Sequence, residues 1–197
     1  MTGAGLLMLA VLSTAPENDG SAFDEDRFGI ELSGQATVTR TGWTFGGSGP
    51  GFAAGLRLRF GPNLGIGVAV ESSAGGSADP DRPWTIHRQQ IAFDVQWRFD
   101  TGPHIRPWVS LGMAFGKVDL DEDDGPHVSS AHAVDWVRLG LGVDFLIGRN
   151  LALGPLVRGS LGRTGLASPE DIATTPPPDT HRALNTFELG VRTLVGF

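Results

Sequence analysis

From residue 28 onward, apolar and polar side chains alternate along the chain with a period of two. The clearest stretch is 91–99, where every second residue is large and apolar and the residues between are small or polar. Successive side chains of a β-strand point to opposite faces of a sheet, so this pattern predicts a strand with one apolar face. The same pattern, weaker in several copies, predicts seven further strands, over 28–38, 52–60, 64–70, 107–115, 137–147, 151–161 and 187–197.

The segments between the predicted strands alternate in length. Short turns rich in Gly, Pro and Asn lie at 61–63, 100–103 and 148–150, and long polar segments lie at 41–51, 72–88, 119–134 and 164–182. Up-and-down connectivity places the turns at one end of the sheet and the long segments at the other. Outer-membrane barrels show this asymmetry. We therefore expect an all-β fold, an eight-stranded antiparallel up-and-down transmembrane β-barrel.

The polar face is predicted to be the inner face. A solvated convex surface usually carries long charged side chains, whereas the interior of an eight-stranded barrel is only wide enough for side chains to fill it. Small residues are therefore expected inside. The polar face carries ten glycines, Gly55, Gly65, Gly67, Gly112, Gly116, Gly140, Gly142, Gly162, Gly190 and Gly196.

Charged residues are sorted between the two faces in the same way. The apolar face over 28–38 and 137–147 carries no charge, as contact with lipid requires, since an Arg or Lys at the midplane costs ~2–4 kcal/mol. Buried charges are tolerated when they are paired, and guanidinium groups bind carboxylates with two hydrogen bonds. We predict a network that closes the lumen, built from seven arginines and five carboxylates: Arg57, Arg59, Arg98, Arg106, Arg138, Arg158, Arg192, Glu31, Glu71, Asp94, Asp144 and Glu188.

Aromatic residues gather near the ends of the predicted strands. Such clusters are typical of the girdles that outer-membrane barrels place at both membrane interfaces. The turn-side set is Phe28, Phe60, Trp97, Phe99, Phe145 and Phe197, and the loop-side set is Phe52, Trp84 and Phe115.

Two prolines interrupt strand patterns that are otherwise regular. Pro107 and Pro155 lie inside predicted strands. Each removes a backbone donor from the hydrogen-bond ladder, so we expect a β-bulge or an altered register near each of them.

The end of the chain resembles a family signature. Phe197 follows the alternating residues Leu189, Val191, Thr193 and Val195, as in the C-terminal strand of bacterial outer-membrane barrels. With the strand and loop pattern, residues 28–197 resemble the small OmpA/OmpX-type barrel superfamily. The resemblance implies an outer-membrane location, contact with membrane lipids and lipopolysaccharide, and a monomer. It also implies that Phe197 is an assembly signal recognised by the outer-membrane assembly machinery.

The first 27 residues differ from the rest. Residues 5–12 are apolar, and the small residues Ser13, Thr14 and Ala15 precede a polar stretch, as in a secretory signal peptide, although no Lys or Arg precedes the apolar run. We expect a signal peptide or its remnant at 1–19, a polar segment at 20–27 and the barrel domain at 28–197.

Composition excludes several functional classes. The 197 residues include 29 glycines, about 15% of the chain and roughly twice the usual share. The absence of cysteine excludes disulfides, thiolate metal sites and a cysteine nucleophile. A net charge of −7 argues against binding to nucleic acid, because phosphate contacts need a basic surface. Beyond the N-terminus, no apolar run approaches the ~18–20 residues of a membrane-spanning helix.

Few residues indicate catalysis or metal binding. His127-Val128-Ser129 resembles the H-x-S element of outer-membrane lipid A deacylases, but it lies in a predicted loop, and Asp135 is the nearest downstream acid. A polar loop is the favoured interpretation, because nucleophile, base and orienting acid must all meet in space. The acidic segment 119–125 lacks the glycine and closing Glu positions of an EF-hand, so a solvated loop is favoured there too. We expect no metal site and no cofactor.

Three functions remain open at this point. We favour a structural or interaction protein that displays four loops for surface binding or adhesion, with a closed lumen and no enzymatic activity. The alternatives are a lipid A-modifying enzyme acting through His127 and Ser129, and a narrow channel, which requires a gap in the charge network. A soluble lipocalin-like carrier is a fallback and requires the apolar face to lie inside.

Overall fold

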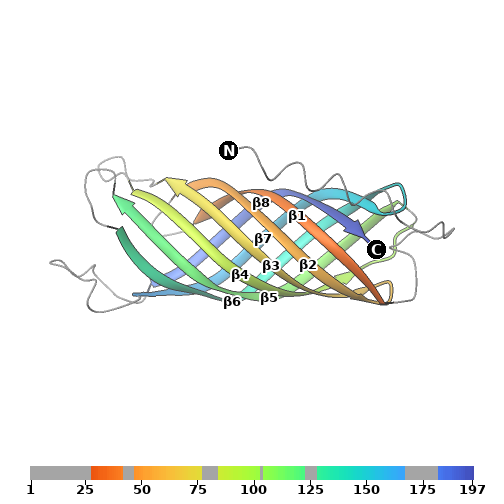
Figure 1. The fold of residues 1–197 in the computed structure, drawn as a ribbon, viewed down its shortest axis with the longest axis horizontal. Helices are drawn as coiled ribbons and strands as arrows, with labels where there is room; N and C mark the ends of the chain where they lie inside the picture. Colours follow the sequence, from red (N-terminus) through yellow and green to blue (C-terminus); the bar gives the residue numbers. More distant parts are fainter. Residues whose placement is uncertain (1–27, 42–46, 77–83, 103, 123–127, 167–181) are drawn as a thin grey trace.

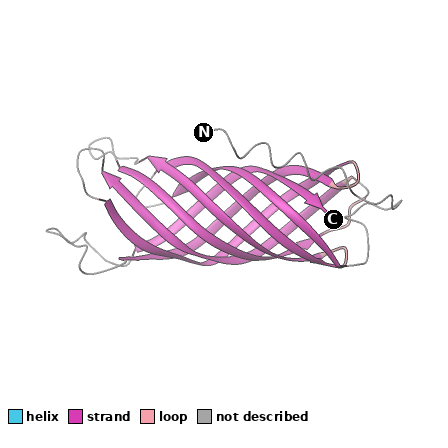
Figure 2. Cartoon of the chain, viewed as in Figure 1, coloured by secondary structure: helices cyan, strands magenta, loops and turns pink. Residues whose placement is uncertain are grey.

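The chain forms one closed sheet of eight strands. The computed structural model describes residues 28–41, 47–76, 84–102, 104–122, 128–166 and 182–197. Each strand pairs antiparallel with its neighbours in the sequence, and the last pairs with the first, which confirms the predicted fold (Figures 1 and 2). The strands are β1 (Phe28–Thr41), β2 (Ser48–Phe60), β3 (Leu64–Gly76), β4 (Trp84–Arg98), β5 (Ile105–Glu122), β6 (Val128–Ile147), β7 (Leu151–Leu166) and β8 (Arg182–Gly196).

No helix in the described ranges is long and apolar enough to cross a membrane.

The strands extend further toward the loop end than the alternation predicted. β5 has 18 residues and β6 has 20, and their pairing continues as far as Asp121 and Val128. The prediction of a loop is therefore wrong for 119–122 and 128–134, and residues 123–127 lie outside the described residues. Strands also enter the other three segments predicted as long loops. A tilted strand needs only ~9–11 residues to cross a membrane. Beyond that length the outward side chains do not contact lipid and need not be apolar, but the backbone groups still pair with those of the neighbouring strand.

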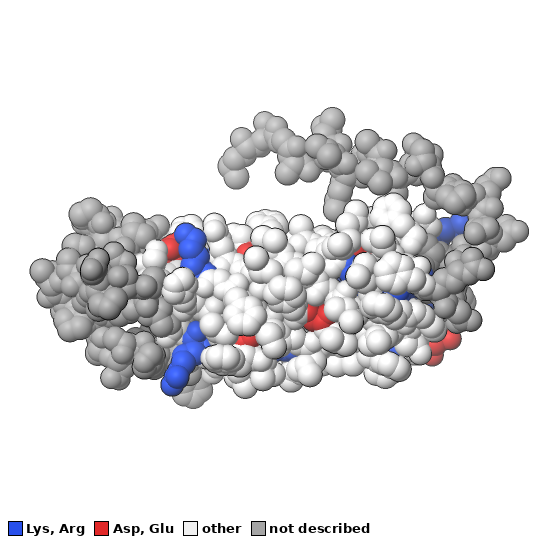
Figure 3. Space-filling view, turned by 60° about the horizontal axis from the view of Figure 1, so that its bottom comes forward, with Lys and Arg blue, Asp and Glu red and all other residues white. Residues whose placement is uncertain are grey.

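The apolar face points outward, and the polar face lines the lumen. Ile91 and Leu141 are 48% and 59% exposed, whereas Arg98 and Arg138 are 4% and 5% exposed. Figure 3 shows a mostly white belt along the barrel, with Lys and Arg side chains near its border with the loop end. The lipocalin-like alternative is wrong, because a soluble barrel would bury the side chains that are exposed here.

Inner glycines make room for large inner side chains. Trp108 of β5 is 4% exposed and lies against Gly140 and Gly142 of β6. A Cβ atom at Gly142 would lie 2.6 Å from Trp108 Cε2, and one at Gly65 would lie 2.6 Å from Cδ of Arg57. The small residues of the polar face therefore have a packing reason inside the lumen.

The outward aromatics form two groups. All six aromatics predicted at the turn end are at least 45% exposed, and Phe52 and Phe115 near the loop end are also exposed, whereas the side chain of Trp84 lies outside the described residues. With a rise of ~3.3 Å per residue and a tilt of ~40°, eight to ten positions along a strand span ~20–25 Å of membrane. Outward aromatics show this spacing on three strands: Phe52 and Phe60 at β2, Trp136 and Phe145 at β6, and Phe187 and Phe197 at β8.

The irregularity of the sheet lies at Trp136, not at the prolines. Asp135 pairs with Gly162 of β7 while Val137 pairs with Leu161, so Trp136 is an extra residue in β6. The expected bulge or register change at Pro107 and Pro155 is wrong. Pro107 pairs with Val143 of β6 and Pro155 with Val191 of β8, and the register is the same on either side of each proline. The ladder between β6 and β7 has no pair at Pro155 and Gly154, but it resumes in the same register. A missing N–H removes one hydrogen bond, and the neighbouring pairs keep the strands aligned.

Candidate functional site in the barrel lumen

The charged residues predicted for the lumen lie on its wall. Ten of the twelve are buried, and Asp94 and Arg158 are half-buried. Two further charged residues, Arg88 and Asp135, are 5% and 1% exposed and also face inward. The described part of the lumen thus holds eight arginines and six carboxylates, two more positive than negative charges, in a chain whose net charge is −7.

A first group of contacts lies toward the turn end. Arg98 at the end of β4 donates two parallel hydrogen bonds to Glu31 on β1, from Nη1 to Oε1 and from Nη2 to Oε2. These strands are not neighbours, so the pair crosses the lumen. The planar guanidinium matches a carboxylate in this two-bond geometry.

Arg192 lies at the centre of the same region and is 1% exposed. Its Nε and Nη2 donate to Oδ1 and Oδ2 of Asp144 at 3.2 and 2.5 Å, and its Nη1 donates to Oε1 of Gln96 at 2.7 Å. The guanidinium carbon lies 3.9 Å from the ring centre of Trp108, whose Nε1 donates to Asp144 Oδ1 at 3.2 Å. Four strands thus meet around one cation.

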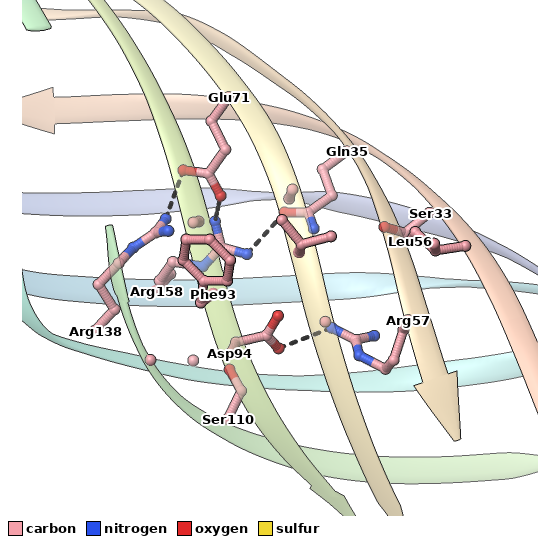
Figure 4. A pocket seen from close by; sticks show the side chains of 16 residues that line it. Ser33, Gln35, Leu56, Arg57, Glu71, Phe93, Asp94, Ser110, Arg138 and Arg158 are labelled. Atoms are coloured by element: carbon pink, nitrogen blue, oxygen red, sulfur yellow. Dashed lines mark hydrogen bonds and ion pairs between the residues drawn. The ribbon is translucent and has the colours of Figure 1, made fainter. Parts of the chain in front are cut away.

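A second group of contacts surrounds Glu71 of β3. Arg138 Nη2 of β6 donates to its Oε2 at 2.6 Å, and Arg158 Nη1 of β7 donates to its Oε1 at 2.8 Å. Gln90 of β4 also donates to Oε2. Figure 4 shows both arginines reaching Glu71 from the other side of the lumen.

Arg158 joins this second group to two more strands. Its Nη1 also lies 3.0 Å from Oε2 of Glu188 on β8. Its Nη2 donates to Oε1 of Gln35 on β1 at 2.9 Å (Figure 4). Separate pairs lie on either side along the barrel. Arg57 Nη2 is 2.8 Å from Asp94 Oδ2, and Arg88 Nη2 is 2.5 Å from Asp135 Oδ2.

Little space remains between these side chains. Two cavities between them have volumes of about 20 and 10 Å³, and Gln35, Glu71 and Arg158 line both of them. Each volume is close to the ~10–15 Å³ that one water molecule needs. The second group of contacts therefore borders two spaces, each of which has room for about one water molecule.

The structure also shows which site residues the sequence reasoning missed. Arg88 was assigned to a loop, but β4 begins at Trp84 and includes it. Within this strand Arg88 lies two positions from the buried Gln90, so both side chains point to the inner face. Asp135 has the opposite parity to Arg138, and only the bulge at Trp136 turns both side chains inward. Trp108 was also missed, although it has the same parity along its strand as Arg106 and Gly112, which the alternation assigns to the inner face.

The other candidate residues are placed in part. His127 and the side chain of Ser129 lie outside the described residues, and so does most of the acidic segment 119–125. Asp135 is engaged with Arg88. Asp119 lies 2.8 Å from Lys117 on the outer face. Within the described ranges, no group of three or more His, Asp or Glu side chains is arranged to hold a metal ion.

Phe197 lies at the seam that closes the barrel. Its N–H donates to the carbonyl of Ile30 at 2.9 Å, and its carbonyl accepts from the Ile30 N–H at 3.4 Å. The ring itself is 50% exposed on the outer face. The C-terminal residue thus pairs through its backbone and presents its side chain outward.

Comparisons with known proteins agree with this architecture. Neisserial surface protein A (NspA) is similar in structure, with a TM-score of 0.58 at 15% identity over 86% of this chain and 97% of that one. The N-terminal β-barrel domain of Pseudomonas aeruginosa OprF gives 0.51 at 16% identity over 86% and 97%. Ail, the attachment invasion locus protein of Yersinia pestis, gives 0.51 at 14% identity over 85% and 99%. At these identities the likeness is one of fold.

Sequence comparison identifies the family. No protein with a curated description matches the chain. The family model described as the outer membrane protein beta-barrel domain matches residues 4–191. The chain therefore belongs to the outer membrane protein beta-barrel domain family and is a small eight-stranded barrel of the Gram-negative bacterial outer membrane.

Proposed function

We propose that this protein is a structural and interaction barrel, which spans the outer membrane with a closed lumen and presents its loop end at the cell surface for binding or adhesion. One observation carries the proposal. Cross-barrel contacts centred on Glu71 and Arg192 support a closed lumen, because the two cavities that border the Glu71 contacts have volumes of about 20 and 10 Å³. A barrel without a pore or an internal ligand cavity has its free surface at its two ends and on its lipid-facing wall.

Recordings from single barrels in planar lipid bilayers test the closed lumen. We expect the wild-type protein to give no conductance steps. A triple variant, Glu71→Ser, Arg138→Ser and Arg158→Ser, removes the group between the two cavities and is expected to give steps. Steps from the wild-type protein would instead support the narrow-channel alternative.

Cysteine labelling tests the orientation of the barrel, because the chain has no cysteine of its own. Arg163 at the loop end of β7 and Arg149 in the turn before β7 are both exposed. A membrane-impermeant maleimide is expected to label Arg163→Cys on intact cells and Arg149→Cys only after the outer membrane is permeabilised. The reverse pattern would contradict the proposed display of the loop end.

The partners implied by the proposal are membrane lipids, lipopolysaccharide in the outer leaflet and the outer-membrane assembly machinery. The proposal also takes the protein to be a monomer. The exposed ring of Phe197 at the seam supports its role as the assembly signal. Phe197→Ala is expected to reduce the amount of barrel assembled in cells while leaving spontaneous folding into lipid vesicles unchanged. Equal assembly in cells would refute the assembly role.

The proposal includes no enzymatic activity. The hypothesis of a lipid A deacylase rests on His127 and Ser129, whose side chains lie outside the described residues, so it stays a prediction. Purified wild-type protein and Ser129→Ala are expected to be equally inactive on lipid A. Hydrolysis that is lost in Ser129→Ala would establish the enzyme alternative.

A further inference from the structure

The larger of the two luminal cavities has a wall with more positive than negative charges. Its volume is about 20 Å³, and three guanidinium groups but two carboxylates line it, from Arg57, Arg138, Arg158, Glu71 and Asp94. Figure 4 shows these five side chains around the cavity, each from a different strand. One positive charge in this wall therefore has no counterpart in the wall.

The other carboxylates near these arginines lie outside the larger cavity. Glu188 contacts Arg158 at 3.0 Å but lines the smaller cavity, and Asp135, which is 3.9 Å from Arg138, lines neither. The wall of the smaller cavity is balanced, with two guanidinium groups and two carboxylates, from Arg88, Arg158, Glu71 and Glu188. Of the two cavities, only the larger one has an excess of positive charge in its wall.

Several hydrogen-bond donors of the residues around the larger cavity lack an acceptor. Arg57 Nη2 donates to Asp94, but Nε and Nη1 of Arg57 are buried and have no hydrogen-bond partner in the described part of the chain. The same holds for Nε of Arg138. Ser33 and Ser110 also line the cavity, and each carries a hydroxyl that can donate. The surroundings of this cavity therefore favour a guest that accepts hydrogen bonds.

We propose that the larger cavity binds one small monovalent anion, chloride in ordinary saline. A halide ion only accepts hydrogen bonds, which suits the donors of Arg57, Arg138 and Ser33. A water molecule must also donate two hydrogen bonds, and it brings no charge to balance the third guanidinium group. Buried charges need compensation, and a charge contact is stronger where water is excluded.

The size of the cavity selects among anions. Its volume of about 20 Å³ exceeds the ~10–15 Å³ that one water needs, which leaves room for the slightly larger chloride ion but not for sulfate or phosphate, with five heavy atoms each. The ion is a resident counter-ion of the charge network, so the lumen stays closed with the ion in place. The inference does not rest on the proposed display of the loop end.

Urea unfolding of the full chain in phosphatidylcholine vesicles tests the proposal. Sodium gluconate is replaced stepwise by sodium chloride at constant ionic strength, because gluconate is too large for the cavity. An ion that binds only the folded barrel lowers the equilibrium constant of unfolding, and we expect a drop of about tenfold, as for chloride at about ten times its Kd. A change of less than about twofold over the titration would overturn the proposal.

Two variants of Ser33 separate the effect of charge from the effect of filling the cavity. Ser33→Asp places a carboxylate where the anion is proposed to bind, and Ser33→Asn is the matched control of the same size without the charge. Both variants are expected to lose the response to chloride. In gluconate, Ser33→Asp is expected to have the smaller equilibrium constant of unfolding, because its carboxylate replaces the ion.

Two results would contradict this reasoning. If Ser33→Asp is no more stable than Ser33→Asn in gluconate, the wall does not favour a negative charge. If both variants keep the response of the wild type, chloride acts at another place on the barrel.

Anomalous diffraction from crystals of the wild-type protein grown in sodium bromide locates the ion without any substitution. Bromide is similar to chloride in size and charge, so we expect a peak in the cavity between Arg57, Arg138 and Ser33, and none in the smaller cavity. The absence of a peak in the larger cavity would overturn the proposal. Conductance steps from the wild-type barrel would refute the closed lumen without moving this peak, so the two proposals fail separately.

Discussion

Replacing Glu71 by Gln tests the idea that paired charges stabilise the closed lumen. Glu71 is 8% exposed and accepts hydrogen bonds from Arg138 at 2.6 Å and Arg158 at 2.8 Å. Glutamine keeps the size of the side chain but removes the negative charge. Arg138 then retains Asp135 at 3.9 Å, and Arg158 retains Glu188 at 3.0 Å.

The expected loss follows from these remaining partners. Removing one member of a buried ion pair costs about 3–5 kcal/mol, because the other charge stays buried without compensation. Since both arginines keep a second carboxylate, we expect Glu71→Gln to lower the free energy of unfolding by about 3 kcal/mol. Urea unfolding of the barrel in phospholipid vesicles, followed by tryptophan fluorescence, measures this difference.

Glu188→Gln is the matched control. It removes the same charge from the same layer, but Glu188 contacts Arg158, which keeps its shorter contact with Glu71. One charge-assisted hydrogen bond is worth about 1.5 kcal/mol, so a smaller loss is expected. Equal losses in the two variants, or a loss below about 1 kcal/mol for Glu71→Gln, would refute the reasoning, because water in the lumen would then replace the carboxylate.

Three further substitutions test other parts of the fold, each by the same unfolding measurement. Arg192→Lys is expected to cost about 2 kcal/mol, since an ammonium cannot make the two-bond contact with Asp144 or stack on Trp108; a loss below 0.5 kcal/mol would contradict this. Gly142→Ala is expected to cost about 1–3 kcal/mol, because its Cβ overlaps Trp108, and the combination with Trp108→Leu should recover part of the loss. Leu141→Arg places a charge on the lipid face and is expected to cost about 2–4 kcal/mol in vesicles; an unchanged stability would mean that this face does not contact lipid.

The composition of the luminal site was predictable from the chain to a large extent. Residues such as Glu31, Arg98 and Arg192 alternate with apolar neighbours, and parity alone assigns them to one face. Their partners were not predictable in this way. Arg98 contacts Glu31 and Arg138 contacts Glu71 across the lumen. The members of each pair are far apart in the sequence, and only the closure of the barrel brings them together.

The amino-acid sequence by itself determined the number of strands, the outward apolar face and most of the charged residues that line the lumen. These follow from a period of two, which is a local property of a strand with lipid on one side. Only the tertiary structure decided how far the strands extend and which residues the bulge at Trp136 turns inward. Strand ends depend on backbone pairing with a neighbouring strand. Beyond the membrane the side chains no longer need to alternate, so the sequence pattern does not show where that pairing ends. A bulge inverts parity without a distinctive residue, which is why Asp135 reaches Arg88 in the lumen although the alternation around Arg138 assigns it to the opposite face.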